Sequence, residues 1–158
     1  MGLTAYFSLG LLSCLVVGPF MSSVQAADCP NHWLSFSGHC YGYFHQELSW
    51  QQAEGQCQRN GGHLASILSR DEHKAIARFL QGVQKWDDED VWIGLYIPAS
   101  GDGWAWADGS PVAYTAWEKV QSYFTLKGGH CAALDESSGF RLWDGDECHD
   151  RNPFLCKV

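Results

Sequence analysis

Two segments in the first half of the chain show the apolar spacing of amphipathic helices. The first follows Ser49, which forms a capping box with Gln52, and it should end at Asn60–Gly62. The second follows a similar start at Ser69, and its apolar side chains recur three and four residues apart at Ala75, Ile76, Phe79, Leu80 and Val83. We therefore expect two helices, each with one face in the core.

The rest of the pattern is typical of short strands. They are predicted where aromatic or continuous apolar residues are bounded by turn signals, at His39–Phe44, Val91–Leu95, Trp104–Trp106, Cys131–Leu134, Phe140–Trp143 and Phe154–Cys156. Residues 113–129 show no clear period, which predicts a long irregular loop. Two early helices and late strands indicate an α+β domain.

The first 26 residues have the pattern of a secretory signal peptide. Leu9–Phe20 is an apolar run of about a dozen residues, shorter than the ~20 that span a bilayer, and Val24–Ala26 offers small residues for signal peptidase. We expect a signal peptide over 1–26, with cleavage after Ala27 as the near alternative, and one domain over 27–158. A retained membrane anchor is the competing interpretation, but no Lys or Arg flanks the run.

The cysteine content indicates an oxidising, extracellular environment. Cleavage after residue 26 removes Cys14 and leaves an even set, namely Cys29, Cys40, Cys57, Cys131, Cys148 and Cys156. The sequence has no close C-x-x-C pair of the kind that zinc sites use. Three disulfides are therefore expected in a secreted protein, although spacing alone leaves many pairings open.

The composition indicates one globular domain with an acidic balance. Hydrophobic residues make up 46% of the 158, and 18 Asp and Glu against 10 Lys and Arg give a net charge of −8. No basic run is present to follow a phosphate backbone, which argues against a nucleic-acid partner. The sequence contains neither an H-E-x-x-H nor a G-x-S-x-G motif, so we expect no enzymatic activity.

Four motifs together resemble the C-type lectin-like domain. They are Trp92-Ile93-Gly94-Leu95, the turn Trp104-x-Trp106-x-Asp108-Gly109, Trp143 five residues before Cys148, and the closing Phe154-x-Cys156. Three further segments look most like the soluble single-domain members, at Asp28–Phe44, His63–Ile67 and Leu134–Phe140. These members are the eggshell-matrix lectin-like proteins, the regenerating-protein group and, more distantly, the venom lectin-like subunits.

The resemblance implies an architecture and a disulfide pairing. Members of this family combine two helices with antiparallel sheets, a long irregular loop and three disulfides. By position, the resemblance implies the pairs Cys29 with Cys40, Cys57 with Cys156, and Cys131 with Cys148.

The resemblance also implies that the usual calcium and sugar site is lost. Sugar-binding members hold Ca²⁺ with a Glu-Pro-Asn or Gln-Pro-Asp triplet in the long loop, an acidic residue before the next cysteine, and a Trp-Asn-Asp motif. Here 118–122 contains no such triplet, Gly129 replaces the acidic residue, and Gly145 replaces the last Asp. Only Asp144 of the set remains, so we expect no resident cofactor and at most low-affinity Ca²⁺ binding.

Other acidic residues leave a second cation site open. Asp144, Asp146 and Asp150, with Asp135 and Glu136, either rebuild such a site or are solvated loop acids. We keep Asp144 and Asp146 as metal candidates, and Asp135 and Glu136 as ligand-binding candidates.

Two further loop features each have a structural and a functional interpretation. The run Asp87–Asp90 is expected to be an exposed loop, or else a surface that gathers Ca²⁺ near growing mineral. Trp86 and Trp117 lie at loop positions and are candidates for stacking on a ligand, with Trp117 kept as a ligand-binding candidate.

These observations predict a secreted, non-enzymatic binding protein that has lost calcium-dependent sugar recognition. Its expected partners are glycans bound without calcium, or protein or mineral surfaces, with no nucleic acid and no membrane span; the oligomeric state is open. One alternative is a structural eggshell or biomineral matrix protein. Another is a venom-type subunit acting on haemostatic proteins, which ranks lower because residues 113–129 lack the interchain cysteine that such dimers usually carry.

Overall fold

The computed structural model describes residues 28–117 and 129–158. The expected signal peptide over 1–26 and the loop positions 118–122 lie outside these residues. The described helices are α2 (Trp50–Arg59), α3 (Arg70–Val83) and the short 3₁₀ helix η3 (Glu136–Ser138). The strands are β1 (Leu34–Phe36), β2 (His39–Leu48), β3 (His63–Leu64), β4 (Val91–Tyr96), β5 (Ala105–Trp106), β6 (Cys131–Leu134), β7 (Trp143–Asp146) and β8 (Asn152–Lys157).

Both predicted helices begin where their capping signals lie. The capping box at the start of α2 is complete: the backbone N–H of Gln52 donates to Ser49 Oγ, and the backbone N–H of Ser49 donates to Gln52 Oε1, each over 3.3 Å. At α3 the backbone N–H of Glu72 donates to Ser69 Oγ over 3.1 Å. These bonds satisfy N–H groups that have no partner inside a helix, which fixes the first residue of each one.

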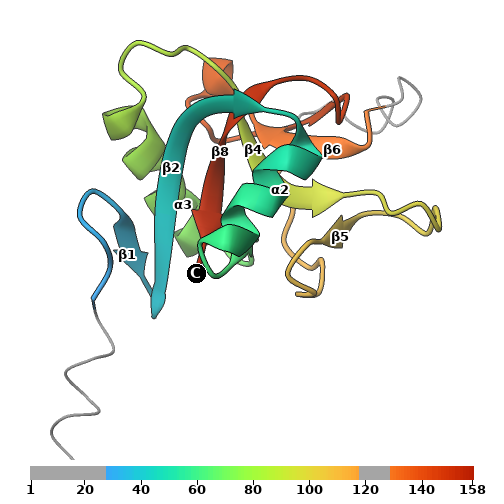
Figure 1. Cartoon of the computed structure of the whole chain (residues 1–158), viewed down its shortest axis with the longest axis horizontal. Helices are drawn as coiled ribbons and strands as arrows, with labels where there is room; N and C mark the ends of the chain where they lie inside the picture. Colours follow the sequence, from blue (N-terminus) through green and yellow to red (C-terminus); the bar gives the residue numbers. More distant parts are fainter. Residues whose placement is uncertain (1–27, 118–128) are drawn as a thin grey trace, which may run out of the picture.

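The strands form one mixed sheet in the order β1-β2-β8-β4-β6-β7, with β3 added to β8 and β5 to β4. Every pairing is antiparallel except that of β4 with β8, where Trp92 lies opposite Phe154. The last strand of the chain therefore enters the middle of the sheet beside β2 (Figure 1). The expected antiparallel arrangement is correct for all pairs but this central one.

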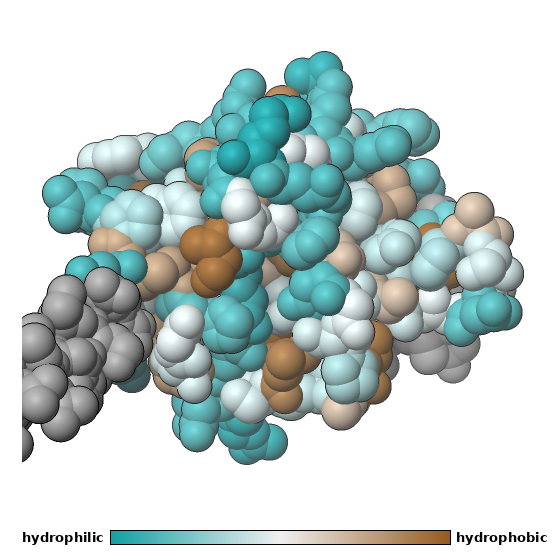
Figure 2. Space-filling view, turned by 60° about the horizontal axis from the view of Figure 1, so that its bottom comes forward, coloured by the Kyte–Doolittle hydropathy of each residue, from teal (hydrophilic) through white to brown (hydrophobic). Residues whose placement is uncertain are grey.

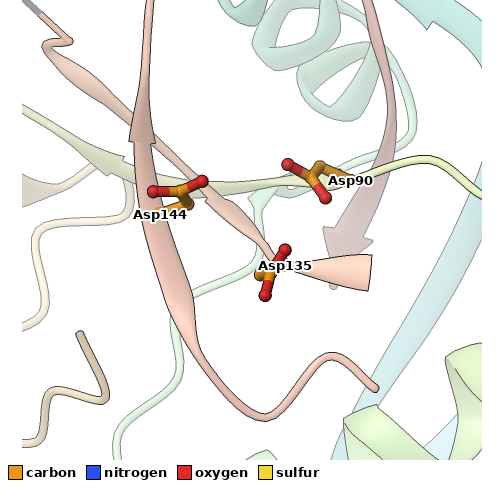
Figure 3. A group of neighbouring side chains, drawn as sticks. All are labelled: Asp90, Asp135 and Asp144. Atoms are coloured by element: carbon orange, nitrogen blue, oxygen red, sulfur yellow. The ribbon is translucent and has the colours of Figure 1, made fainter. Parts of the chain in front are cut away.

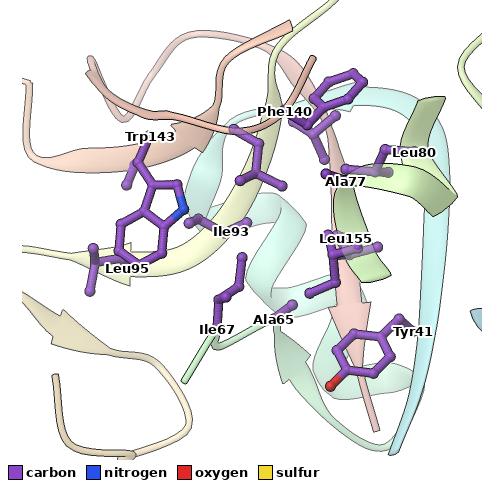
Figure 4. Packing of buried hydrophobic residues seen from close by; sticks show 14 of the residues in the cluster. Tyr41, Ala65, Ile67, Ala77, Leu80, Ile93, Leu95, Phe140, Trp143 and Leu155 are labelled. Carbon is purple, nitrogen blue, oxygen red and sulfur yellow. The ribbon is translucent and has the colours of Figure 1, made fainter. Parts of the chain in front are cut away.

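The central strand β4 separates two layers of core. Five of its six residues, Val91–Leu95, are buried on whichever face they point to, as expected for an inner strand covered on each side. Val91 and Ile93 pack with α3 in one hydrophobic cluster (Figure 4), whereas Trp92 packs with α2 in another. The two helices thus cover opposite faces of the sheet, because successive side chains of a strand point to opposite faces.

Three parts of the strand prediction differ from the structure, and one of them is the two-residue β3, where no strand was expected. A strand was expected over Phe140–Trp143, but β7 starts only at Trp143, because Gly139 and Phe140 have φ angles of 72° and 65° in the left-handed region. β1 was not predicted at all. It pairs with β2 through the turn Ser37-Gly38, whose two positive φ angles are those of a tight hairpin turn.

Three disulfides cross-link this fold, and their pairing is the one that the family resemblance implied. Cys29 pairs with Cys40, Cys57 with Cys156, and Cys131 with Cys148. The second of them joins α2 to β8 over a separation of 99 residues, so that the chain-entropy model assigns it about 4–5 kcal/mol.

A buried ion pair lies beside the core. Lys157 Nζ lies 2.7 Å from Glu72 Oε2 and also donates to Ser66, while the hydroxyl of Tyr41 donates to the same carboxylate oxygen. The second oxygen of Glu72 accepts from the backbone N–H of Leu68 over 2.7 Å. Both charges are thus compensated, as buried charges need to be.

Among the described residues no helix combines the length and the apolar character needed to cross a membrane. On the face shown in Figure 2, hydrophobic residues form separate small areas among hydrophilic ones. The largest exposed aromatic side chain of the described residues is Trp86, at 90% exposure.

Candidate functional site

Three carboxylates from three neighbouring strands converge at one end of the sheet. Asp90 directly precedes β4, Asp135 directly follows β6, and Asp144 lies within β7. One oxygen from each lies within 4.8 Å of the others, and Figure 3 shows the three side chains around a common space. We call these three residues the carboxylate cluster.

Local hydrogen bonds hold two members of the carboxylate cluster in place. Asp90 Oδ1 accepts the backbone N–H of Glu136 over 2.8 Å, so η3 is tied to the start of β4. Asp135 is only 8% exposed, and its carboxylate accepts the hydroxyl of Ser137 at 2.9 Å and 3.0 Å. The acidic side chains are therefore ordered parts of the fold.

Burial and mutual repulsion raise the pKa values of the acids in this region. The pKa of Asp90 is raised to about 6, mainly because the carboxyl group is buried. The charges of Asp135 and Asp144 raise it further, whereas the hydrogen bond from the N–H of Glu136 opposes the shift. Burial, followed by the charge of Asp144, raises the pKa of Asp146 to about 7. A cation would relieve this repulsion, and closely spaced carboxylate oxygens are the ligands that calcium prefers.

The acidic run is arranged differently from the exposed loop that we expected. Only Asp88 is exposed; the other three residues of the run are half-buried. Asp87 accepts the hydroxyl of Tyr43 over 2.9 Å and lies 2.8 Å from His45 Nδ1, and this contact with His45 lowers the pKa of Asp87. Asp90 belongs to the carboxylate cluster. The expectation of four solvated carboxylates was wrong, because Asp87 bonds side chains of β2 and Asp90 bonds the backbone of η3.

The loop interpretation of Asp144 and Asp146 was also wrong. Both are half-buried residues of β7, where Asp144 lies opposite Ala133 and Asp146 opposite Cys131. Asp146 is not one of the three acids whose oxygens meet within 4.8 Å. Beside it, Asn152 is 8% exposed, and its side chain opposes the upward shift in the pKa of Asp146.

The remaining ligand-binding candidates lie in two environments. Glu136 is half-buried, and it touches the carboxylate cluster through its backbone N–H. Trp117 is half-buried, with its ring 4.8 Å from that of Trp104 and 5.6 Å from that of Trp143, so it packs at the edge of the core. Its role in ligand stacking stays a prediction, as does that of the exposed Trp86.

The two glycines that the resemblance places at calcium-ligand positions, Gly129 and Gly145, lie close together in the structure. An ideal Cβ placed on Gly129 would lie 2.8 Å from the carbonyl oxygen of Gly145, closer than real Cβ atoms come. Neither residue has a side chain to donate an oxygen, and Asp144 instead joins the carboxylate cluster. The triplet position lies outside the described residues. Loss of the usual calcium and sugar site therefore stays a prediction.

Apart from the carboxylate cluster, the structure has a cavity of about 420 Å³ beside α3 that the sequence analysis did not predict. Four cationic side chains line it, at Arg70, Lys74, Arg78 and Arg141. The first three recur every four residues, so the helix prediction could have placed them on one face. Arg141 comes from the segment after η3, and no sequence pattern connects it with the helix.

Comparison with known proteins identifies the family. The model of the Lectin C-type domain matches residues 46–158, which is more than half of the chain. The protein therefore belongs to the C-type lectin domain family, and the resemblance drawn from its motifs is confirmed.

The relatives lie in the groups that the motifs indicated. The chain is 49% identical to dromaiocalcin-1 of Dromaius novaehollandiae over 142 residues, covering 88% of this chain and 96% of the relative. It is 38% identical to regenerating islet-derived protein 4 of Homo sapiens over 151 residues, covering 93% and 92%. Its structure is similar to that of ovocleidin-17 of Gallus gallus, described as a major protein of the eggshell calcified layer, with a TM-score of 0.74 and 36% identity over 82% of this chain and 98% of the other.

Proposed function

We propose that this protein is a secreted, non-enzymatic binding protein that attaches to calcium-bearing mineral surfaces through the carboxylate cluster and does not use calcium to bind sugars. The observation that carries the proposal is the convergence of Asp90, Asp135 and Asp144 within 4.8 Å. An ordered group of convergent carboxylates can hold one calcium ion of a crystal face without losing side-chain freedom on contact.

The electrostatics of the region support this function. Burial, and after it the charges of neighbouring carboxylates, raise the pKa values of Asp90 and Asp146, so the free protein holds these charges against desolvation and repulsion near neutral pH. Contact with calcium removes part of this repulsion, so that binding gains free energy that an isolated surface carboxylate does not supply. The net charge of −8 adds a long-range attraction to a cationic face.

Three further observations are consistent with the proposal. Gly129 and Gly145 supply no ligand to the usual calcium site, which favours a function without calcium-dependent sugar binding. The three disulfides suit an extracellular protein. The similar ovocleidin-17 is described as a protein of a calcified layer, and the same setting is proposed for this chain.

Adsorption to calcite tests the proposal. The triple variant Asp90→Asn, Asp135→Asn, Asp144→Asn removes three charges from the carboxylate cluster and should need about fivefold or more protein for half-maximal coverage. The matched control Asp28→Asn, Asp71→Asn, Asp102→Asn removes three exposed charges elsewhere and should adsorb nearly as the parent does. If both variants lost the same amount of affinity for calcite, the loss would follow from net charge alone, and the carboxylate cluster would be rejected as the contact.

Retention on sugar resins tests the second half of the proposal. With glycines at two ligand positions, the protein should pass through mannose and galactose resins in calcium without delay. Elution by a chelator from either resin would show an intact calcium and sugar site and would contradict the proposal.

A further inference from the structure

Against the acidic balance of the whole molecule, four of its ten Lys and Arg residues line one cavity of about 420 Å³. Arg70, Lys74 and Arg78 stand in a row on α3, about 12 Å long from the rise of the helix. Arg141 enters from the segment between η3 and β7. None of the described residues that line the cavity is acidic. We call this cavity the basic cleft.

The four cations of the basic cleft are exposed and lack acidic partners. In the part of the chain that the structure describes, none of them lies within 4.0 Å of a carboxylate, and the three ion pairs found there involve other residues. If these cations had carboxylate partners within the molecule, an anion would have to displace them before it could bind. Because they have none in the described part of the chain, binding of an anion to the basic cleft does not require the free energy of breaking an ion pair.

Neutral hydrogen bonds fix the shape of the basic cleft. Burial lowers the pKa of His73, so its ring is neutral and its Nε2–H donates to the carbonyl of Phe140 over 2.8 Å. The other ring nitrogen then accepts the hydroxyl of Tyr114 over 2.8 Å. Gln81 Nε2 donates to the carbonyl of Gly139 over 2.9 Å, which ties the segment before Arg141 to α3. The wall that carries Arg141 is thus attached to the helix that carries the other three cations.

We propose that the basic cleft binds one chain of a sulfated polysaccharide. The row of cations is longer than a single small anion, so it fits charges repeated along a chain. Three of the four cations are Arg, whose planar fork binds two oxygens of one oxyanion. The half-buried Tyr114 adds a ring that can lie against a sugar face. This site shares no residue with the carboxylate cluster, and the inference does not depend on mineral binding.

Two other polyanions fit the basic cleft less well. An acidic peptide would need apolar pockets for its side chains, but Ala77 is the one aliphatic residue among those that line the cavity. A nucleic-acid duplex presents a broad charged surface, and a protein of net charge −8 would repel it outside the four contacts. A flexible sulfated chain can follow the row and leave the rest of the surface untouched.

The test measures binding of the full secreted chain to a heparin hexasaccharide, for example by calorimetry. The variant Arg70→Gln, Arg78→Gln, Arg141→Gln should bind about tenfold or more weakly. The matched control Arg59→Gln, Lys85→Gln, Arg151→Gln lowers the net charge equally at exposed positions outside the basic cleft and should bind as the parent does. Equal weakening in both variants would overturn the proposal. The melting temperature of each variant shows that it is folded.

Salt and competing ligands complete the test. By analogy with single-stranded polyanions, four contacts make the affinity fall about 50-fold between 50 and 200 mM salt. Neutral dextran should not bind. Displacement of the hexasaccharide by inorganic sulfate at an equal concentration of sulfate groups would reduce the basic cleft to a site for single anions and overturn the proposal. Equally tight binding of a single-stranded DNA oligonucleotide would overturn the assignment to a polysaccharide.

Discussion

Replacement of Asp90 by Asn should stabilise the protein at neutral pH and leave its stability unchanged in acid. The pKa of Asp90 is raised from 3.8 to about 6, so the folded state binds a proton more tightly than the unfolded state does. Stability from this proton is fully present below pH 3.8 and is lost as the pH rises through 6. Asn is uncharged at every pH, and it keeps the oxygen that accepts the N–H of Glu136.

The shift sets the size of the effect. About two pKa units correspond to about 3 kcal/mol at most, and partial solvation of this half-buried carboxylate reduces the expected gain to about 1–2 kcal/mol. For a domain of this size, the melting temperature should rise by about 4–8 °C at pH 7.5. At pH 3.5, where Asp90 of the parent is mostly protonated in both the folded and the unfolded state, the difference should nearly vanish.

Thermal melts at pH 3.5, 5 and 7.5 measure this dependence. Asp88→Asn is the matched control, because Asp88 belongs to the same run but is exposed, and Asn tolerates its positive φ of 49°. The control should change little at any of these pH values. An Asp90→Asn protein that is less stable at pH 7.5, or that differs from the parent equally at all three values, would refute the account of repulsion within the carboxylate cluster.

Three other changes test the core and its polar groups. Lys157→Met leaves the Glu72 carboxylate buried without its cation and should cost about 3–5 kcal/mol in urea unfolding, while adding Glu72→Gln should restore a large part; no restoration would mean that the pair is not coupled. Gly94→Ala places a Cβ 2.4 Å from the carbonyl oxygen of Leu64 and should cost about 1–3 kcal/mol or more, so a melting temperature like that of the parent would contradict this close approach. Because burial lowers the pKa of His73, the unfolded state binds its proton first and stability should fall as the pH drops below 6.5; His73→Gln should remove that slope, and an unchanged slope would assign it to another group.

The parts of the fold that local chemistry determines could be predicted from the sequence. The helix starts at Ser49 and Ser69 follow from side chains that bond backbone N–H groups three residues away. The strand over Phe140–Trp143 failed because its apolar residues fill the core from a left-handed turn, which hydropathy does not distinguish from a strand. The hairpin that creates β1 could have been found from the turn residues Ser37-Gly38.

Neither functional feature follows from local sequence. The acids were grouped by nearness in the chain, whereas the carboxylate cluster takes one member each from the ends of β4 and β6 and from β7. Strand order and register decide this grouping, and they depend on long-range pairing. The basic cleft has the same origin, because Arg141 meets the cations of α3 only through the packing of the segment after η3.

The disulfide between Cys57 and Cys156 also determines how the molecule responds to mechanical load. If a matrix pulls on Asp28 and Val158, tension passes through this covalent bond, and the 99-residue span that it closes is shielded. The bridge between Cys29 and Cys40 closes a second loop, so the residues between them cannot extend either. Only about 20 residues can then straighten, which limits the extension to roughly 70–80 Å. The strands that carry the carboxylate cluster and the helix that carries the basic cleft lie inside the closed span, so both keep their geometry while the ends of the chain are stretched.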